Sequence, residues 1–425
     1  MTAAREISLS LPADVALAAT VRSTAHAAVS GFGFDEAAAS GLAQSLDEIF
    51  EFVATVRAGT AFHVTVADRR HRAEAEVRCD LPRAELHWLS AVRPIDLNDE
   101  DALRALGLLL SSRLVDRFSV GFDPLGAVVL RLSKDRAYPP ASATAEPRPA
   151  DPDIRSDGLV RVPSDGQMLR LASLFRTACT GPVPLPFRGE GRAADMRTAG
   201  DLDAAVVTDP GGGVQGAIAW VRTSPRLVTV FGPVMAAGRE HLAAPLTDHL
   251  LRLLARSDTL VVVAERIAPG FPDTQFERLG TLAGREVFYR GLEEDPGAFC
   301  WADDETRPLL EAVHERMSLP RDVLDAATVL EPVLAHGLVG AEIDRSTKQV
   351  TLRPLIDGRD MAILLATHVD LCRRDGFEHI LLATDHGIGW HARLGGAIRI
   401  AGFSPRILLP NAATGDVLMW EAELA

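Results

Sequence analysis

Residues 228–290 read VTVFGPVMAAGREHLAAPLTDHLLRLLARSDTLVVVAERIAPGFPDTQFERLGTLAGREVFYR. Runs of apolar β-branched residues alternate here with apolar residues at helical spacing. The order predicts a strand, a turn, a helix, a strand, a second helix over 273–280 and a last strand. The turn before the first helix carries a single glycine, Gly238. Because unpaired amides and the dipole of a helix N-terminus attract anions, this turn is a candidate phosphate site.

The residues around this stretch predict two similar halves, 158–297 and 298–425. In the first half a strand, a helix (165–177) and two strands precede the quoted residues. The second half predicts a similar order, although sequence identity between the halves is low. Its expected elements are a helix (304–318), strands (339–344 and 349–355), a helix (358–374), a strand (379–384), a helix (388–396) and a strand (416–424).

A third region, residues 1–133, precedes these halves and predicts an α/β sandwich. We expect helices at 13–29, 35–58 and 100–116, and strands at 62–68, 73–80 and 127–134. Residues 134–157 contain five prolines and almost no apolar side chains, which predicts a linker.

Composition narrows the function classes. The chain has 425 residues and a formal net charge of −14, which disfavours nucleic-acid and anionic-membrane binding. No apolar run reaches the roughly 18 residues of a membrane span, and residues 1–20 lack a signal-peptide core. The cysteines form no CxxC pair, so neither a metal site nor a disulfide framework is expected. They are Cys79, Cys179, Cys300 and Cys372. A reduced cytoplasm is the expected location.

Stretches of the N-terminal region that carry a family resemblance are SLDEIFEFV (45–53), RCD (78–80) and, within 106–134, LGLLLSSRLVDRFSV followed by GAVVLRLSK. They resemble the anti-sigma-factor serine kinases of the GHKL ATPase superfamily. The resemblance implies Glu48 as the activating acid, Asp80 as the adenine reader and Gly107 at the end of the nucleotide lid.

The chain departs from that pattern where the metal and lid would be. Phe52 stands where the family has a magnesium-binding Asn, and Pro82 replaces a glycine after Asp80. A phenyl ring offers no oxygen to Mg²⁺. We therefore expect no kinase activity. Weak ATP or ADP binding and docking of a protein partner stay open, and docking is favoured.

The loop REHLAA (239–244) and the strand VVVAER (261–266) carry a second resemblance. They resemble the GCN5-related N-acetyltransferases (GNAT), whose Arg/Gln-x-x-Gly-x-Gly/Ala loop holds the pyrophosphate of acyl-CoA. The resemblance implies acetyl-CoA or another acyl-CoA as cofactor, bound by Val234, Arg239, Leu242, Ala243, Ala244 and Gln275. Leu242 departs from the pattern, and Glu240 adds a negative charge beside the expected phosphates.

The same resemblance implies a general base and a general acid. Glu265 ends the predicted central strand, and Tyr289 lies on the following strand. The alternative for Glu265 is an ion pair with Arg266 or Arg285. The alternative for Tyr289 is a core aromatic.

The second half ends with GFSPRILLP (402–410) and GDVLMW (415–420), which resemble the tail of bacterial proteins with tandem GNAT-like units. Asp385, His386 and His391 follow a predicted strand. Their spacing is not that of a metal site, so surface or helix-cap roles are expected.

Two functions are consistent with these residues. The first is an N-acyltransferase that uses acyl-CoA at 228–290 to modify a small-molecule or protein amine. The second is a catalytically silent regulator that binds a partner through its N-terminal region. A biosynthetic use of the cleft for another ligand stays open.

Overall fold

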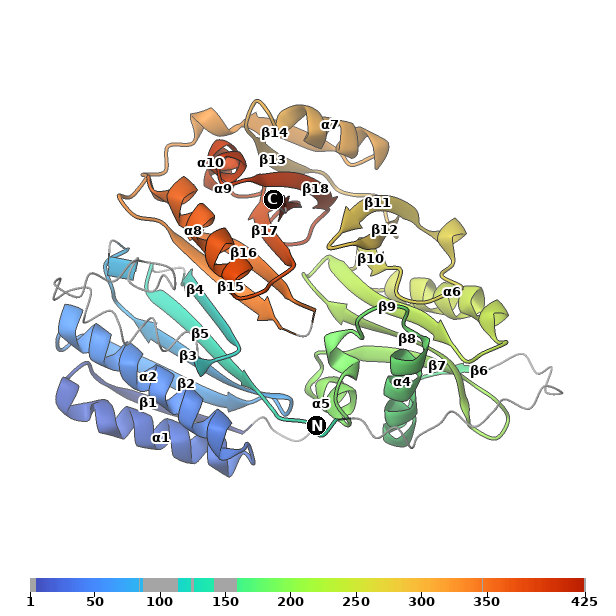
Figure 1. The fold of residues 1–425 in the computed structure, drawn as a ribbon, viewed down its shortest axis with the longest axis horizontal. Coiled ribbons are helices and arrows are strands. Elements are labelled where there is room, and N and C mark those ends of the chain that lie inside the picture. Colours follow the sequence, from blue (N-terminus) through green and yellow to red (C-terminus); the bar gives the residue numbers. More distant parts are fainter. Residues whose placement is uncertain are drawn as a thin grey trace.

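The computed structural model describes residues 5–83, 85–86, 114–123, 126–140, 159–345 and 347–423. The strands form a ten-stranded sheet, a seven-stranded sheet and a parallel pair, flanked by helices (Figure 1). The predicted mixed α/β class is therefore confirmed. Within the described ranges, no helix is long and apolar enough to cross a membrane.

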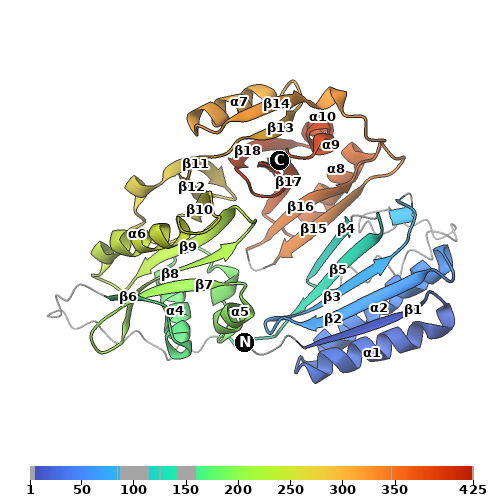
Figure 2. The ribbon, with the colours of Figure 1, turned by 180° about the vertical axis from the view of Figure 1, so that it is seen from behind.

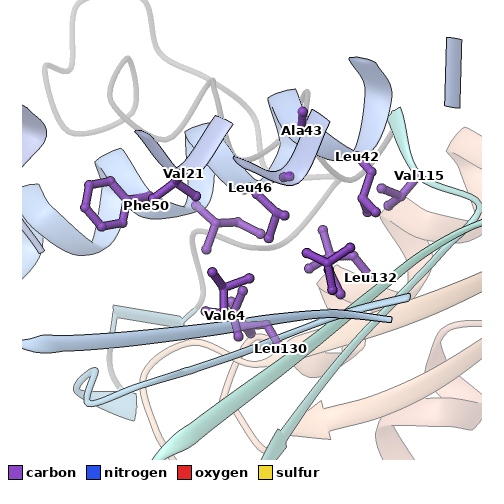
Figure 3. Close-up of a cluster of buried hydrophobic side chains, with 14 of the residues drawn as sticks. Val21, Leu42, Ala43, Leu46, Phe50, Val64, Val115, Leu130 and Leu132 are labelled. Atoms are coloured by element: carbon purple, nitrogen blue, oxygen red, sulfur yellow. The ribbon is translucent and has the colours of Figure 1, made fainter. Parts of the chain in front are cut away.

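The N-terminal module packs two helices against one face of a five-strand segment. Its elements are β1 (Glu6–Pro12), α1 (Ala18–Gly31), α2 (Glu36–Val56), β2 (Ala61–Asp68), β3 (Arg72–Cys79), β4 (Arg117–Phe122) and β5 (Val128–Asp135). Side chains from α1 and α2 meet those of the strands in one apolar layer (Figure 3). Strands β1 and β4 are absent from the predicted elements. Of the helix expected over 100–116, only residues 114–116 are described.

The first unit is built on the seven-stranded sheet, in the order β11-β12-β10-β9-β8-β7-β6. Its strands are β6 (Leu159–Arg161), β7 (Asp203–Thr208), β8 (Val214–Arg222), β9 (Leu227–Met235), β10 (Val261–Glu265), β11 (Glu277–Leu282) and β12 (Arg285–Gly291). Its α-helices are α4 (Asp165–Ala178), α5 (Arg192–Ala199) and α6 (Ala243–Leu254). Core clusters lie on both faces of the sheet, one with α4 and α5 and the other with α6.

The helix predicted over 273–280 is wrong. A short 3₁₀ turn (Asp273–Gln275) stands there, followed by β11, which pairs antiparallel with β12. The hairpin turn is Ala283–Gly284, and both residues have positive φ (48° and 71°). Such two-residue turns match the twist of paired strands. The turn holds residues 277–282 in a strand despite their partly helical spacing.

The second unit contributes the parallel pair and five strands of the larger sheet. Its strands are β13 (Ala298–Ala302), β14 (Arg321–Asp325), β15 (Leu338–Asp344), β16 (Gln349–Ile356), β17 (His379–Asp385), β18 (Phe403–Leu409) and β19 (Val417–Ala422). Its helices are α7 (Arg307–Arg316), α8 (Met361–Arg374), α9 (Gly389–Arg393) and α10 (Gly395–Ile400). Strands β13, β14 and β18 were not predicted.

The two units share one pairing pattern. Strands β8 and β9 pair antiparallel, β9 and β10 parallel, and β10 and β12 antiparallel. Strands β15, β16, β17 and β19 repeat these three relations in the same chain order. A helix, α6 or α8, connects the two parallel strands in each case.

The N-terminal module continues the sheet of the second unit instead of standing apart. Strand β4 pairs antiparallel with β15 through Arg117 and Glu342, which makes the ten-stranded sheet (Figures 1 and 2). Residues of the predicted linker are also ordered against the first unit. The Tyr138 hydroxyl donates to Asp195 at 2.8 Å, and Pro140 bridges Gly189.

Candidate active site

Strand β9 continues past the carboxyl end of its parallel partner β10. Their register ends where Val230 faces Ala264, yet β9 continues to Met235. A bulge in the pairing of β8 with β9, at Gly232 and Pro233, bends the strand over this stretch. Open α/β sheets bind ligands beyond the carboxyl ends of their strands, so the opening is a candidate site.

The loop after β9 leads directly into α6. The amide of Arg239 donates to the Ala236 carbonyl at 3.0 Å, and a 3₁₀ turn (Glu240–Leu242) precedes the helix. No side chain caps the start of α6. The first turn therefore keeps the positive end of the helix dipole without an internal acidic cap.

A carboxylate lies within this loop. Glu240 Oε1 accepts a hydrogen bond from the Gly238 amide at 3.1 Å. Gly270 lies close to the same side chain. A Cβ placed on Gly270 would be 3.6 Å from the Cβ of Glu240. Glu240 thus occupies one donor that an anionic ligand would use.

The structure brings together five of the six expected cofactor residues. Arg239, Leu242, Ala243 and Ala244 form the loop and the first turn of α6. Val234 lies just before them on β9 with its side chain buried in the core. Gln275 lies beside a later part of α6, where its side-chain amide donates to Asp248 at 2.7 Å.

Glu265 ends β10 beside the opening. Its Oε2 accepts a hydrogen bond from Arg285 Nη1 at 2.6 Å, so Arg285 is its ion-pair partner. Arg266 instead pairs with Asp273 and Glu286. Burial raises the pKa of Glu265, and Arg285 opposes that rise. A carboxyl with a raised pKa and a cationic neighbour is suited to proton transfer.

Tyr289 lies on the same face of the sheet as Glu265, opposite Val263. It is only 6% exposed and sits in the apolar layer between the two units. Burial raises its pKa to about 12. This position matches the alternative of a core aromatic.

A pocket of about 410 Å³ adjoins the end of β10. The loop after α4, the β11–β12 turn and the edge of the second unit form its walls. Its lining includes Thr180, Arg266, Arg285, Gln349 and His379. Arg285 connects the pocket to Glu265, and it also donates to Gln349 at 3.1 Å. Sequence reasoning missed this pocket because Gln349 and His379 come from the other unit.

The matching loop of the second unit is closed. Gly358 bridges Leu334, whose carbonyl accepts from the Arg359 amide at 3.0 Å. A side chain on Gly358 would lie 1.9 Å from the Gly337 nitrogen. Asp360 accepts from the Gly337 amide at 2.7 Å. Backbone atoms and the Asp360 carboxylate therefore fill the place that a phosphate would take.

The nucleotide residues expected in the N-terminal module form no comparable opening among the described residues. Asp80 pairs with Arg57 at 2.5 Å, and Phe52 is buried. Burial and then the Glu51 and Asp47 carboxylates raise the pKa of Glu48. Gly107 lies outside the described residues.

The Asp385 cluster is buried, so the expected surface role is wrong. Asp385 accepts hydrogen bonds from the Gly387, Thr414 and Gly415 amides. His391 Nδ1 accepts from the Asp385 amide at 3.0 Å, and burial lowers the pKa of His391 to about 4. These side chains hold the loop after β17 in place.

A second buried cluster could not be predicted from the sequence, because its members are far apart in the chain. Ligand atoms of Cys300, His314 and Asp416 lie within 4.8 Å of one another. Arg321 donates to both Asp416 oxygens, at 2.9 and 3.1 Å. The guanidinium already supplies the positive charge that a metal ion would bring, so the cluster reads as an ion-pair network.

Comparisons with known proteins add limited information. No family model matches the chain, and no curated protein matches it. Solved N-acetyltransferases overlap 32% of it. A GNAT-family N-acetyltransferase from Escherichia coli in complex with CoA has 20% identity, 83% of its own chain covered and a TM-score of 0.26. A phosphinothricin acetyltransferase from Sinorhizobium meliloti in complex with AcCoA has 16%, 89% and 0.26.

The aminoglycoside 6'-N-acetyltransferase from Enterococcus faecium has 10% identity, 99% of its own chain covered and a TM-score of 0.28. TM-scores this low support no conclusion about fold or function. Both are therefore inferred from the strand order and the side chains of this chain.

Proposed function

We propose that the first unit binds an acyl-CoA and transfers its acyl group to an amine. The observation that carries this proposal is the end of β9, which is unpaired on the β10 side after Val230 and leads to the uncapped start of α6. An extended pantetheine-like chain can pair with the free edge of β9, while the α6 end attracts the pyrophosphate. Arg239 and the small residue Ala244 lie where that phosphate group would approach.

The chemistry needs positioning and one proton acceptor. The amine attacks the thioester carbonyl, a C–N bond forms and the C–S bond breaks. Glu265 takes the proton of the amine through a water, and the same proton is then passed to the sulfur, which leaves as the free thiol. Burial raises the pKa of Glu265, and pairing with Arg285 favours its ionised form. We leave Tyr289 out of this chemistry because it is buried between the units.

The pocket at the end of β10 suits the amine substrate. It adjoins Arg285, the partner of Glu265, and is lined by side chains of both units. Under this proposal the second unit, whose own loop is closed, serves as a wall of the acceptor site.

The test is calorimetric titration of the full chain with acetyl-CoA and with CoA. Changing Ala244→Glu places a carboxylate at the phosphate position and should abolish binding. Changing Glu240→Gln removes a like charge and should tighten binding roughly fivefold, about 1 kcal/mol. The matched control is Glu294→Gln, an exposed residue after β12. Absence of heat with both the natural chain and Glu240→Gln would reject the proposal.

A second function is favoured by a different observation: side chains of the chain itself occupy each candidate ligand site. Glu240 occupies the first loop, Asp360 the second, and Arg57 holds Asp80. A silent regulator that binds a protein partner through its N-terminal module accounts for this pattern. Weak ADP or ATP binding there is part of the same proposal.

A nucleotide titration with and without Mg²⁺ tests the nucleotide-binding part of this second function. If Asp80 keeps an adenine-reading role, changing Arg57→Ala should free it and strengthen ADP binding. The exposed Arg83→Ala serves as a control. If the affinity for ADP is unchanged in Arg57→Ala, protein docking is the remaining role for the N-terminal module.

A further inference from the structure

The seam between the N-terminal module and the second unit contains a pocket of about 290 Å³. Strands β4 and β15 are paired at one position only, where Arg117 faces Glu342. Beyond that point each strand stays paired on its other side, β4 with β5 and β15 with β16. Phe118 and Ser119 of β4 and Gly340 and Ala341 of β15 lie next to this pair, are not paired with each other, and line the pocket. We call this place in the ten-stranded sheet the wedge.

The floor of the wedge is apolar. Phe118 and Leu132 come from the N-terminal module, and Gly340 and Leu355 come from the second unit. A side chain on Gly340 would lie 2.9 Å from Leu355 Cδ1. The missing side chain lets Leu355 lie across the floor, where it also packs on the N-terminal core. The floor suits the apolar body of a small ligand.

The walls carry more positive than negative charge. Four arginines and two glutamates line the pocket: Arg72, Arg117, Arg131, Arg353, Glu74 and Glu342. Neighbouring carboxylates neutralise most of the arginines. Arg131 pairs with Glu76 at 2.8 Å, and Arg117 pairs with Asp135 at 2.8 Å.

Arg353 is the exception. It stands on β16 opposite Gly340, and no carboxylate of the described residues lies within ion-pair distance of it. The Arg353 side chain is exposed at this pocket, and the chain as a whole carries a formal charge of −14. A guanidinium with no ion-pair partner in such a chain attracts anions. Arginine also offers the planar fork that suits carboxylate and phosphate groups.

We propose that this seam pocket binds a small organic anion, a carboxylate or a phosphate monoester with a flat apolar body. Arg353 holds the anionic group, and Phe118 and Leu355 contact the body. Since the pocket is lined from both sides, the bound anion joins the N-terminal module to the second unit. The site is distinct from the opening beside Glu265.

The experiment titrates the full chain with benzoate and phenyl phosphate, and with benzamide as the neutral counterpart, by ligand-observed NMR and calorimetry. We expect one site per chain for at least one anion and at least tenfold weaker binding of benzamide. The stronger of the two anions identifies the preferred head group. Failure of both anions to bind, or equal binding of benzamide, would overturn the proposal.

Variants locate the site. Arg353→Gln should weaken the anion roughly tenfold, as expected for one charge-assisted hydrogen bond, and Arg353→Lys should restore part of the affinity. Arg256→Gln, an exposed arginine after α6, should bind as the natural chain does. Hydrogen exchange should slow in β4 and β15 on ligand addition and stay unchanged in α6. Binding that survives Arg353→Gln, or exchange protection elsewhere only, would contradict the assignment.

Discussion

At the scale of single residues, Glu265 and Arg285 form the pair on which the proposed chemistry depends. Burial raises the pKa of Glu265 above its ordinary value, and the positive charge of Arg285 holds it down. The carboxylate accepts a proton only when ionised, so activity should fall as the pH drops through this raised pKa.

Removing the guanidinium therefore has a definite direction. Arg285→Gln should raise the pKa of Glu265 further and move the acidic limb of any activity profile to higher pH. The measurement is the ¹³C chemical shift of the Glu265 carboxyl in labelled protein, with Glu265→Gln to assign the signal. A shift toward lower pH would contradict the proposed pairing. Arg290→Gln on the same strand is the control.

Asp416 gives the clearest prediction on stability. Hydrogen bonds from His314 and Arg321, and the charge of Arg321, lower the pKa of Asp416 to about 2 from 3.8. Its folded pKa is depressed, so its stabilisation is present above about pH 4 and lost as the pH falls toward 2. Asp416→Asn removes one of the two carboxylates that neutralise the buried Arg321. The other, Asp295, stays paired with the guanidinium at 2.7 Å.

We expect Asp416→Asn to lower the free energy of unfolding by about 2 to 3 kcal/mol at pH 7. Chemical denaturation at pH 7 and pH 3 measures the free energy of unfolding. The difference between Asp416→Asn and the natural chain should be smaller at pH 3. An exposed carboxylate, Glu294→Gln, should change stability little at either pH. A constant gap would show that the charge of Asp416 is not the cause.

At the scale of elements, α2 depends on a side-chain cap. Asp35 accepts a hydrogen bond from the Ala38 amide at 2.8 Å at the start of this 21-residue helix. Asp35→Ala should lower the free energy of unfolding by about 1 kcal/mol, because the Ala38 amide in the first turn of the helix loses its hydrogen-bond acceptor. Thermal unfolding measures the change, with Gln44→Ala on the exposed face of α2 as the control. An unchanged midpoint of thermal unfolding would show that packing, and not this cap, stabilises α2.

At the scale of the whole molecule, the two units are held together by one apolar layer. Leu381 and Met419 of the second unit pack there against Val263 and Tyr289 of the first. Leu381→Ala should destabilise by about 2 to 5 kcal/mol through the cavity it leaves. Because the layer is shared, amide exchange should accelerate in β12 as well as in β17.

A matched substitution inside one unit separates this effect from general weakening. Leu42→Ala removes an equally buried leucine from the N-terminal core. It should accelerate exchange in β2 and β3 and leave β12 near its natural rate. If Leu381→Ala accelerates β17 alone, the units are not coupled through this layer.

The sequence by itself determined the elements with strong periodicity and the local motif at 236–244. Helices α2, α4, α6 and α8 and strands β9, β10, β16 and β17 lie where apolar spacing predicts them, because burial of one face controls both. Loop residues 239–244 and Glu265 are neighbours along the quoted stretch, so local order was enough to bring them to one end of the sheet.

Only the tertiary structure decided what those residues meet. Spacing did not reveal that β4 would join β15, that Arg285 rather than Arg266 would pair with Glu265, or that Tyr289 would be covered by the second unit. These contacts join residues far apart in the chain or depend on which face of a strand is covered. A strand pattern states which residues alternate, but the partner that covers each face is chosen by packing over the whole molecule.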